Sequence, residues 1–124
     1  MHPSFDSQKS LFQSIAEWLE DTILAGIYTE ESQVPSITEI SVQYKINPAT
    51  ALKGVNMLVE SGLLYKKRGM GMFVSEGARV KLLQQRHQLF FTDYIKPLVD
   101  EASRLEIGKK ELKDMIERGY DHDN

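Results

Sequence analysis

Apolar residues recur every three or four positions from Ser7 to Ala25, a spacing that predicts an amphipathic helix. The residues that recur at this spacing are Leu11, Phe12, Ile15, Trp18, Leu19, Thr22 and Ile23. Gly26 follows as a helix stop. An irregular connector comes next, and its apolar residues Ile27 and Val34 are expected to reach the core.

Two further helices are predicted on either side of a tight turn. Ser36 and Glu39 have the spacing of a capping box, which begins a helix that ends near Tyr44. Asn47 is a good N-cap before Pro48, so a second helix should run to about Ser61. The residues expected to face inward are Ile37, Ile40 and either Val42 or Tyr44, followed by Ala51, Val55 and Leu58. The outer face of the second helix then carries Ala49, Thr50, Lys53, Asn56 and Glu60.

A β-hairpin is predicted after Gly62, which ends the third helix. The segments "LLYKK" and "MFVS" are its strand candidates, and "RGMG" is a tip with two glycines. The order of helix, helix, turn, helix and hairpin predicts a winged helix-turn-helix, a mostly α fold with a small β component. We expect this domain to span residues 1–77.

A long helical pattern from Ala78 to about Ser103 carries a wide apolar stripe. Pro97 lies inside it, so a kink or break is expected near Lys96. The residues of the stripe are Leu83, Phe90, Phe91, Tyr94, Ile95, Leu98 and Ala102. The stripe is either core within one chain or the interface of a homodimer, and its width in so short an appendage favours the homodimer, with contacts from Leu83, Phe90, Phe91, Tyr94 and Leu98.

The rest of the appendage, which we predict to span residues 78–124, is a short helix over "KKELKDMIERG" and a frayed tail, "YDHDN". The aspartates and histidine of that tail are a conceivable metal site, but a flexible end explains them as well. His2, His87 and His122 are isolated from one another, and no set of nucleophile, base and orienting group can be assembled. The sequence therefore predicts no enzyme, no metal and no cofactor.

The composition excludes several classes of protein. The 124 residues are 41% hydrophobic and include no cysteine, which excludes disulfides and thiol chemistry. No apolar run approaches the roughly 20 residues that span a bilayer, and the first residues lack a secretory signal. We expect a cytoplasmic protein.

Positive charge is concentrated at one place in a chain whose formal net charge is −3. Lys66, Lys67 and Arg68 are consecutive at the predicted hairpin tip, and Gly69 and Gly71 follow. Cations on such a wing, together with the N-terminus of a helix, suit the phosphates of DNA. A solvated hairpin is the alternative reading of the same three residues. A phosphate loop around the glycines is disfavoured, because such a loop needs a strand before it, a helix directly after it and further glycines.

Four segments then resemble the winged-helix domain of GntR-type bacterial transcription regulators. They are "AGIY…QVPSITEIS", "INPATALKGVNML", "ESGLLY" and "KKRGMGMFV", in the family's order and spacing, between about Gln8 and Gly77. The "NPAT" turn and the short appendage resemble the YtrA-like branch, whose C-terminal part serves dimerisation. The resemblance implies a homodimeric regulator, most often a repressor, that binds a palindromic operator. Such regulators respond to a small molecule or to stress, and no residue of this sequence identifies the signal.

The resemblance also assigns DNA contacts. They fall on Ser36, Thr38, Asn47, Ala49, Thr50, Lys53, Lys66, Lys67, Arg68, Gly69 and Gly71. Thr38 stands where the family carries a basic residue, Lys53 where it carries arginine, and Met72 where it carries threonine. Thr38 and Lys53 thus lack the planar, fork-shaped group of arginine. Ser36 and Asn47 are helix caps in any case, and they are contacts only if DNA approaches them. Because these departures weaken DNA contact, a winged helix that binds another protein remains the alternative function.

Overall fold

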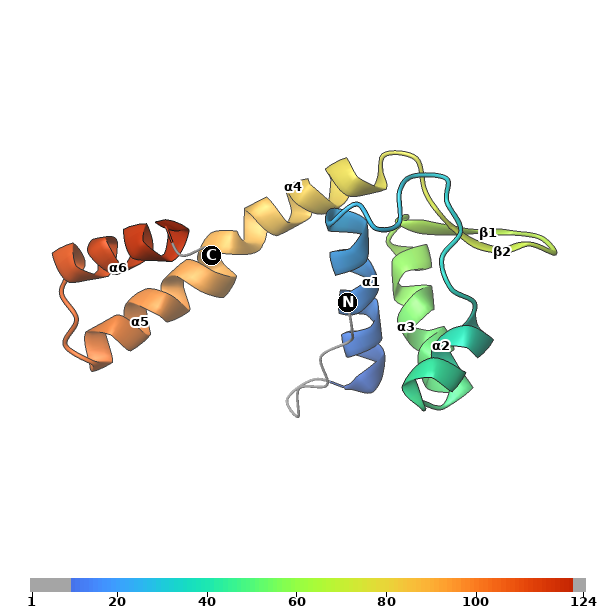
Figure 1. Cartoon of the computed structure of the whole chain (residues 1–124), viewed down its shortest axis with the longest axis horizontal. Coiled ribbons are helices and arrows are strands. Elements are labelled where there is room, and N and C mark those ends of the chain that lie inside the picture. Colours follow the sequence, from blue (N-terminus) through green and yellow to red (C-terminus); the bar gives the residue numbers. More distant parts are fainter. Residues whose placement is uncertain (1–9, 122–124) are drawn as a thin grey trace. The chain divides into compact units, whose positions relative to one another are not determined.

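The computed structural model describes residues 10–121 of the 124-residue chain. Its residues form two compact units, one ending at Gln85 and the other beginning at Arg86. The division falls within helix α4 (Ala78–Phe90), drawn in yellow in Figure 1. The first turns of α4 belong to the N-terminal unit because Ala78 and Leu82 are buried in its core. The functional division after Gly77 stays a prediction.

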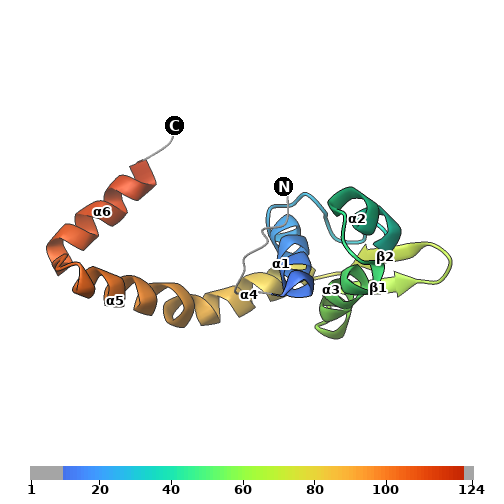
Figure 2. The ribbon, with the colours of Figure 1, turned by 90° about the horizontal axis from the view of Figure 1, so that it is seen from below.

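Three helices form the body of the N-terminal unit, as the sequence predicts. They are α1 (Leu11–Leu24), α2 (Ile37–Tyr44) and α3 (Pro48–Glu60), and α1 and α3 lie side by side in Figures 1 and 2. Their apolar faces share one core, to which they contribute Ile15, Ala16, Trp18, Leu19, Ile23, Ile40, Ala51, Val55 and Leu58. This core fixes where the ends of α2 and α3 lie.

One predicted core position is wrong, since Ile27 is 55% exposed in the connector. Leu11, which shares the helical spacing of α1, is exposed in its first turn, and Val42, one of the two alternatives for the inward place on α2, is 72% exposed. Tyr44 takes the inward place on α2, where its ring meets the Trp18 ring edge-on at 5.3 Å between centroids. An apolar residue at a helix start or in a loop has few neighbours to cover it, and helical spacing alone does not reveal this.

Helix α1 begins later than its apolar spacing indicates. Ser10 is the N-cap: its hydroxyl accepts from the Gln13 N–H, and the Gln13 side chain accepts from the Ser10 N–H. This Ser-x-x-Gln capping box is visible in the sequence and marks the helix start. The predicted helical residues Ser7 to Lys9 lie outside the described part of the chain.

The hairpin consists of β1 (Leu64–Lys67) and β2 (Gly71–Val74), paired antiparallel with Leu64 opposite Val74 and Lys67 opposite Gly71. The connector after α1 runs along the other edge of β2. There the Val34 N–H donates to the Met72 carbonyl at 3.0 Å, and the Val74 N–H donates to the Ser32 carbonyl at 2.9 Å. The connector thereby acts as a third, short strand, which the sequence did not indicate.

Two side chains in the first turn of α4 donate hydrogen bonds to the C-terminal ends of α1 and α3. The Arg79 Nε donates to the Leu24 carbonyl at the end of α1 at 3.0 Å, and the Lys81 ammonium donates to the Ser61 carbonyl after α3. Both carbonyls stand at the negative end of a helix dipole, where cations are stabilising. These contacts join α4 to the N-terminal unit.

The C-terminal unit contains the end of α4, a π-helical turn η1 (Phe91–Ile95), α5 (Lys96–Arg104) and α6 (Lys109–Asp121). The predicted disturbance near Pro97 takes the form of this wide turn and not of a break. The Lys96 N–H donates to the Phe91 carbonyl, five residues back. Because proline has no N–H and its ring crowds the carbonyl four residues earlier, widening the turn before it relieves both problems.

Helix α6 diverges from α5 in Figure 2, so the two form a splayed pair. It continues through Tyr120 and Asp121, which were predicted to fray. The remainder of the predicted tail, residues 122–124, lies outside the described residues.

Candidate nucleic-acid interface

The start of α2 is held by the predicted capping box. The Glu39 N–H donates to the Ser36 hydroxyl at 3.0 Å, and the Ser36 N–H donates to the Glu39 carboxylate at 2.8 Å. The hydrogen bonds from the Ser36 backbone and side chain lower the pKa of Glu39, so the carboxylate is charged at neutral pH. The Ser36 hydroxyl thus accepts from the Glu39 N–H and also forms a hydrogen bond with the Glu39 carboxylate. Thr38 is exposed beside it.

The turn between α2 and α3 is locked by its own residues. Lys45 adopts a left-handed conformation with φ of 55°, and the Ser41 hydroxyl donates to the Ile46 carbonyl at 2.6 Å. Asn47 then caps α3 by accepting from the Ala49 N–H at 2.7 Å. The N-terminus of α3 is thus fixed in direction by the sequence that precedes it.

The first turn of α3 presents small side chains to the outside. Ala49 is exposed and Thr50 is partly exposed, as predicted. Neither of these two side chains is large enough to keep a ligand away from the backbone of this turn. The positive end of the helix dipole favours a ligand that carries negative charge.

The Lys53 side chain does not extend freely into solvent, as a side chain waiting to contact DNA would, but lies against α1. Its Nζ is 4.1 Å from the centre of the Phe12 ring on α1, within the range of a cation–π interaction. Gly54 brings the two helices close enough for this contact, because a Cβ there would stand 2.7 Å from the Phe12 carbonyl oxygen. The predicted close packing at Gly54 is confirmed, but the Lys53–Phe12 contact was not foreseen.

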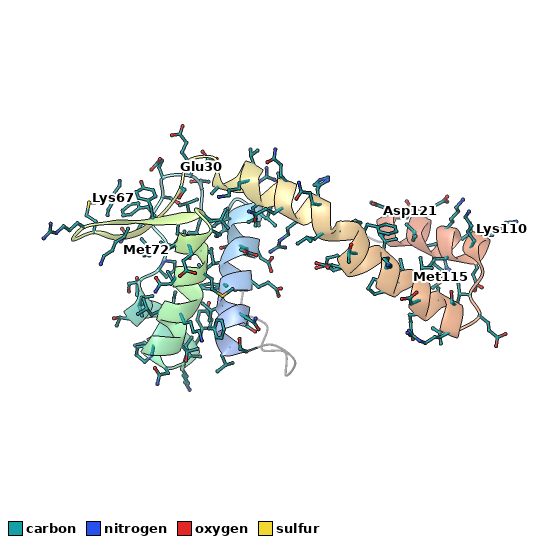
Figure 3. The ribbon with its side chains drawn as sticks, turned by 180° about the vertical axis from the view of Figure 1, so that it is seen from behind. Glu30, Lys67, Met72, Lys110, Met115 and Asp121 are labelled. Carbon is teal, nitrogen blue, oxygen red and sulfur yellow. The ribbon has the colours of Figure 1, made fainter. Side chains whose placement is uncertain are left out.

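The tip of the wing is a tight turn in which the Met70 N–H donates to the Lys67 carbonyl at 2.9 Å. Gly69 and Gly71 have φ of 78° and 119°, which explains why glycine occupies both positions. Lys67 and Met72 lie on opposite sides of the hairpin in Figure 3, as their register requires. Lys67 covers the Phe73 ring, with Nζ 4.3 Å from its centre.

Residues of the connector hold the wing in place. The Gln33 side-chain amide donates to the Met70 carbonyl at 2.6 Å, and the Tyr65 hydroxyl donates to the Glu31 carboxylate. The latter bond raises the pKa of Tyr65. Sequence reasoning missed Gln33 because its partner is 37 residues away and no local pattern marks it.

The predicted contacts thus fall into three groups within the N-terminal unit. The start of α2 carries Ser36 and Thr38, and the first turns of α3 carry Asn47, Ala49, Thr50 and Lys53. The wing carries Lys66, Lys67, Arg68, Gly69 and Gly71. All three cations of the wing are exposed.

The predicted dimer residues lie in α4, η1 and α5. Leu83 is partly buried, whereas Phe90, Phe91, Tyr94 and Leu98 are all exposed. The Phe90 and Tyr94 rings lie 5.5 Å apart, so they form one aromatic surface. Further exposed apolar side chains that the sequence reading did not include are Val99, Leu105, Met115, Ile116 and Tyr120.

Other kinds of site find no support within residues 10–121. No group of three His, Cys, Asp or Glu residues there is placed to hold a metal ion. No helix in this range is long and apolar enough to cross a membrane. His122 and Asp123, from the tail considered as a metal site, lie outside the range.

Three helices, a locked turn and a wing define the N-terminal unit as a winged helix-turn-helix. The chain belongs to the gntR family of bacterial regulatory proteins, whose model matches residues 11–74. This confirms the family predicted from the four segments. The family comprises transcription regulators and not enzymes, so the absence of a catalytic set in the sequence agrees with its identity.

Similarity to individual proteins extends beyond the family match. The HTH-type transcriptional repressor YtrA of Bacillus subtilis (strain 168) is 24% identical over 110 residues, which is 89% of this chain and 84% of YtrA. Longer repressors are matched over 68 to 74 residues, which is 28 to 30% of their own length. The chain is therefore similar in extent to YtrA and shorter than those repressors.

Two solved structures place the fold. A GntR family transcriptional regulator from Listeria monocytogenes superposes with a TM-score of 0.74 at 21% identity, covering 92% of this chain and 98% of that one. The DNA-binding domain of AraR in complex with operator ORE1 has a TM-score of 0.53 at 25% identity, covering 60% of this chain and 94% of that one. The first structure confirms the predicted winged-helix fold.

Proposed function

We propose that this protein is a homodimeric repressor that binds double-stranded DNA at a palindromic operator. The observation that carries the proposal is the combination, in one compact unit, of a capped α3 with small residues in its first turn and a wing with three exposed cations. The AraR domain, which has the same fold, is bound to its operator.

In the proposed complex α3 enters the major groove by its N-terminal end. Ala49 permits close approach of the backbone, and Thr50 lies beside it to contact a base edge or phosphate. Ser36 and Thr38 contact the phosphates beside the groove. Lys66 and Arg68 contact the sugar-phosphate backbone from the wing, where Gly69 allows the main chain to lie close.

The proposed dimer uses the exposed apolar side chains of the C-terminal unit. Phe91 is 61% exposed and Tyr94 is 63% exposed, which is unusual for aromatic residues of adjacent helical turns. A second copy of the chain can bury this surface, because in a two-fold dimer the same apolar patch of each subunit covers that of the other. Two copies of α3 then read two halves of one operator.

Selection of bound duplexes from a random DNA pool, at two salt concentrations, tests the proposal. We expect one palindrome whose half-sites are about one helical turn apart, with affinity that falls steeply as salt rises. Sedimentation of the complex should give two chains per duplex. Recovery of no common sequence, or of a sequence without two-fold symmetry, would contradict the proposal.

Binding to another protein is the second candidate function. It is favoured by the position of Lys53 on the Phe12 ring and by the net charge of −3, since both reduce attraction to phosphate. In that case the selection yields no sequence, and weak binding disappears at moderate salt.

A further inference from the structure

The outer face of α3 includes two exposed large apolar side chains, Leu52 and Met57, among its polar ones. A shallow cavity of about 330 Å³ runs along it, and its lining residues are Ala49, Leu52, Lys53, Asn56, Met57 and Glu60. Leu52 is 46% exposed and Met57 is 38% exposed. A solvent-facing helix surface usually carries polar side chains here, so these exposed apolar groups call for an explanation.

The hydrogen-bonding groups of α3 provide little means of reading guanine. Guanine in the major groove is recognised chiefly by arginine or lysine, and Lys53 is the only cation in α3. Its ammonium group is held over the Phe12 ring at 4.1 Å. Thymine differs from the other bases in presenting a methyl group in this groove, which apolar side chains contact.

We propose that Leu52, together with Ala49, reads thymine methyl groups in the major groove. The two side chains are three residues apart on the helix, so their Cβ atoms are neighbours at about 5–6 Å. Ala49 lies in the first turn of α3, and Leu52 begins the next, which is the part of a recognition helix that meets base edges. The inference rests on the proposed DNA binding and adds the base that is read.

Deoxyuridine substitution in the selected duplex tests this inference, because it removes only the methyl group of thymine. Each thymine is replaced in turn in both half-sites, and the affinity of the full-length protein is measured. One or two positions should show a loss of about four-fold per methyl, the value of one buried CH₂ group. The other thymines should change affinity by less than two-fold.

A double-mutant cycle assigns the methyl contact to its residue. Leu52→Ala should bind the thymine duplex several-fold more weakly, and it should no longer distinguish deoxyuridine from thymine at the sensitive position. Met57→Ala is the matched control, since Met57 is also exposed on α3 but lies further from its N-terminus. It should keep the full deoxyuridine effect. Thermal unfolding establishes that both variants are folded.

The possible failures differ from each other. If no duplex is selected, the proposed DNA-binding function fails and this inference fails with it. If a duplex is selected but its half-sites lack thymine, or no deoxyuridine lowers affinity, only the reading of thymine is overturned. If Leu52→Ala retains the deoxyuridine effect, Leu52 is not the residue that contacts the methyl group.

Discussion

The two compact units treat their apolar residues in opposite ways. The N-terminal unit buries the large side chains of three helices and a hairpin in one core. The C-terminal unit has Ala102 as its buried apolar residue among those described, while its aromatic side chains remain exposed. Similar apolar periodicity in the sequence therefore has two different outcomes.

The difference shows what periodicity can and cannot indicate. An apolar stripe shows that a helix has a face to cover, but it does not show whether the cover is the same chain or another. In the N-terminal unit α1 and α3 approach closely at Gly54 and cover each other. In the C-terminal unit α5 and α6 diverge (Figure 2), and apolar side chains of both helices, such as Val99 and Ile116, are exposed.

The strongest test of this contrast compares two leucines of α3. Leu58 is fully buried, so Leu58→Ala should lower the free energy of unfolding by about 2–5 kcal/mol. Leu52→Ala removes the same atoms from an exposed position and should change it by less than about 0.5 kcal/mol. Chemical denaturation of both variants measures the difference. Equal effects would mean that α3 does not pack as described.

In the C-terminal unit the matching change should affect association and not folding. Phe91→Asp places a charge in the proposed dimer surface and should raise the dimer dissociation constant on the order of 100-fold. Thr92→Asp, an exposed neighbour, serves as the control for added charge. Sedimentation equilibrium measures both. A variant Phe91→Asp that dimerises like the wild type would place the interface elsewhere.

Removing positive charge from one unit or the other tests which of the two units contacts DNA. Lys66→Ala combined with Arg68→Ala should reduce the slope of log affinity against log salt by about 0.9 for each lost phosphate contact, hence roughly 3 to 4 in a dimer. Lys110→Ala combined with Lys113→Ala removes equal charge from the C-terminal unit and should leave the slope nearly unchanged. DNA titrations at several salt concentrations measure the slope for both double variants. Equal reductions would show that net charge, and not the wing, governs binding.

Gln33 offers a smaller test within the N-terminal unit. Gln33→Ala removes the bond to the Met70 carbonyl and should cost about 1 kcal/mol of local stability at the wing tip. Amide hydrogen exchange should become faster in the wing while the amides of α1 keep their protection. Gln33→Glu tests the same contact, since a carboxylate cannot donate to that carbonyl. Unchanged wing exchange in both variants would show that Gln33 does not anchor the tip.

The smallest expected effect concerns pH. Because hydrogen bonds from Ser36 lower the pKa of Glu39, this group stabilises the fold above the usual glutamate pKa, and the stabilisation is lost as pH falls through the lowered value. Glu39→Gln keeps a capping box but should not show this part of the acid dependence. An NMR titration of the Glu39 carboxyl follows the transition directly. A normal or raised pKa would contradict the capping geometry.

Local signals predicted most of the N-terminal unit correctly. The Ser36–Glu39 capping box, the Asn47–Pro48 helix start and the glycines of the wing each depend on neighbours within a few residues. For this reason the helix starts and the hairpin could be placed from the sequence alone. The function was then predicted from the family resemblance, because helix caps and turns indicate structure and do not by themselves indicate function.

Contacts between distant residues could not be predicted in the same way. Gln33 reaches Met70, and Lys53 reaches Phe12, across segments whose spacing is set by the packed core. The exposure of Ile27 likewise depends on what happens to stand nearby, and not on its own hydrophobicity. The contacts of Gln33 and Lys53 are the points at which the candidate nucleic-acid interface differs from its prediction.

The π-helical turn before Pro97 has a consequence for comparing sequences. A turn with five-residue hydrogen bonding contains about one residue more than an α-helical turn. The helical spacing of the residues before it is therefore offset by one position from that of the residues after it. Relatives that lack a proline at this position should align with a gap of one residue between 91 and 95, and their helical faces should still correspond on both sides of it.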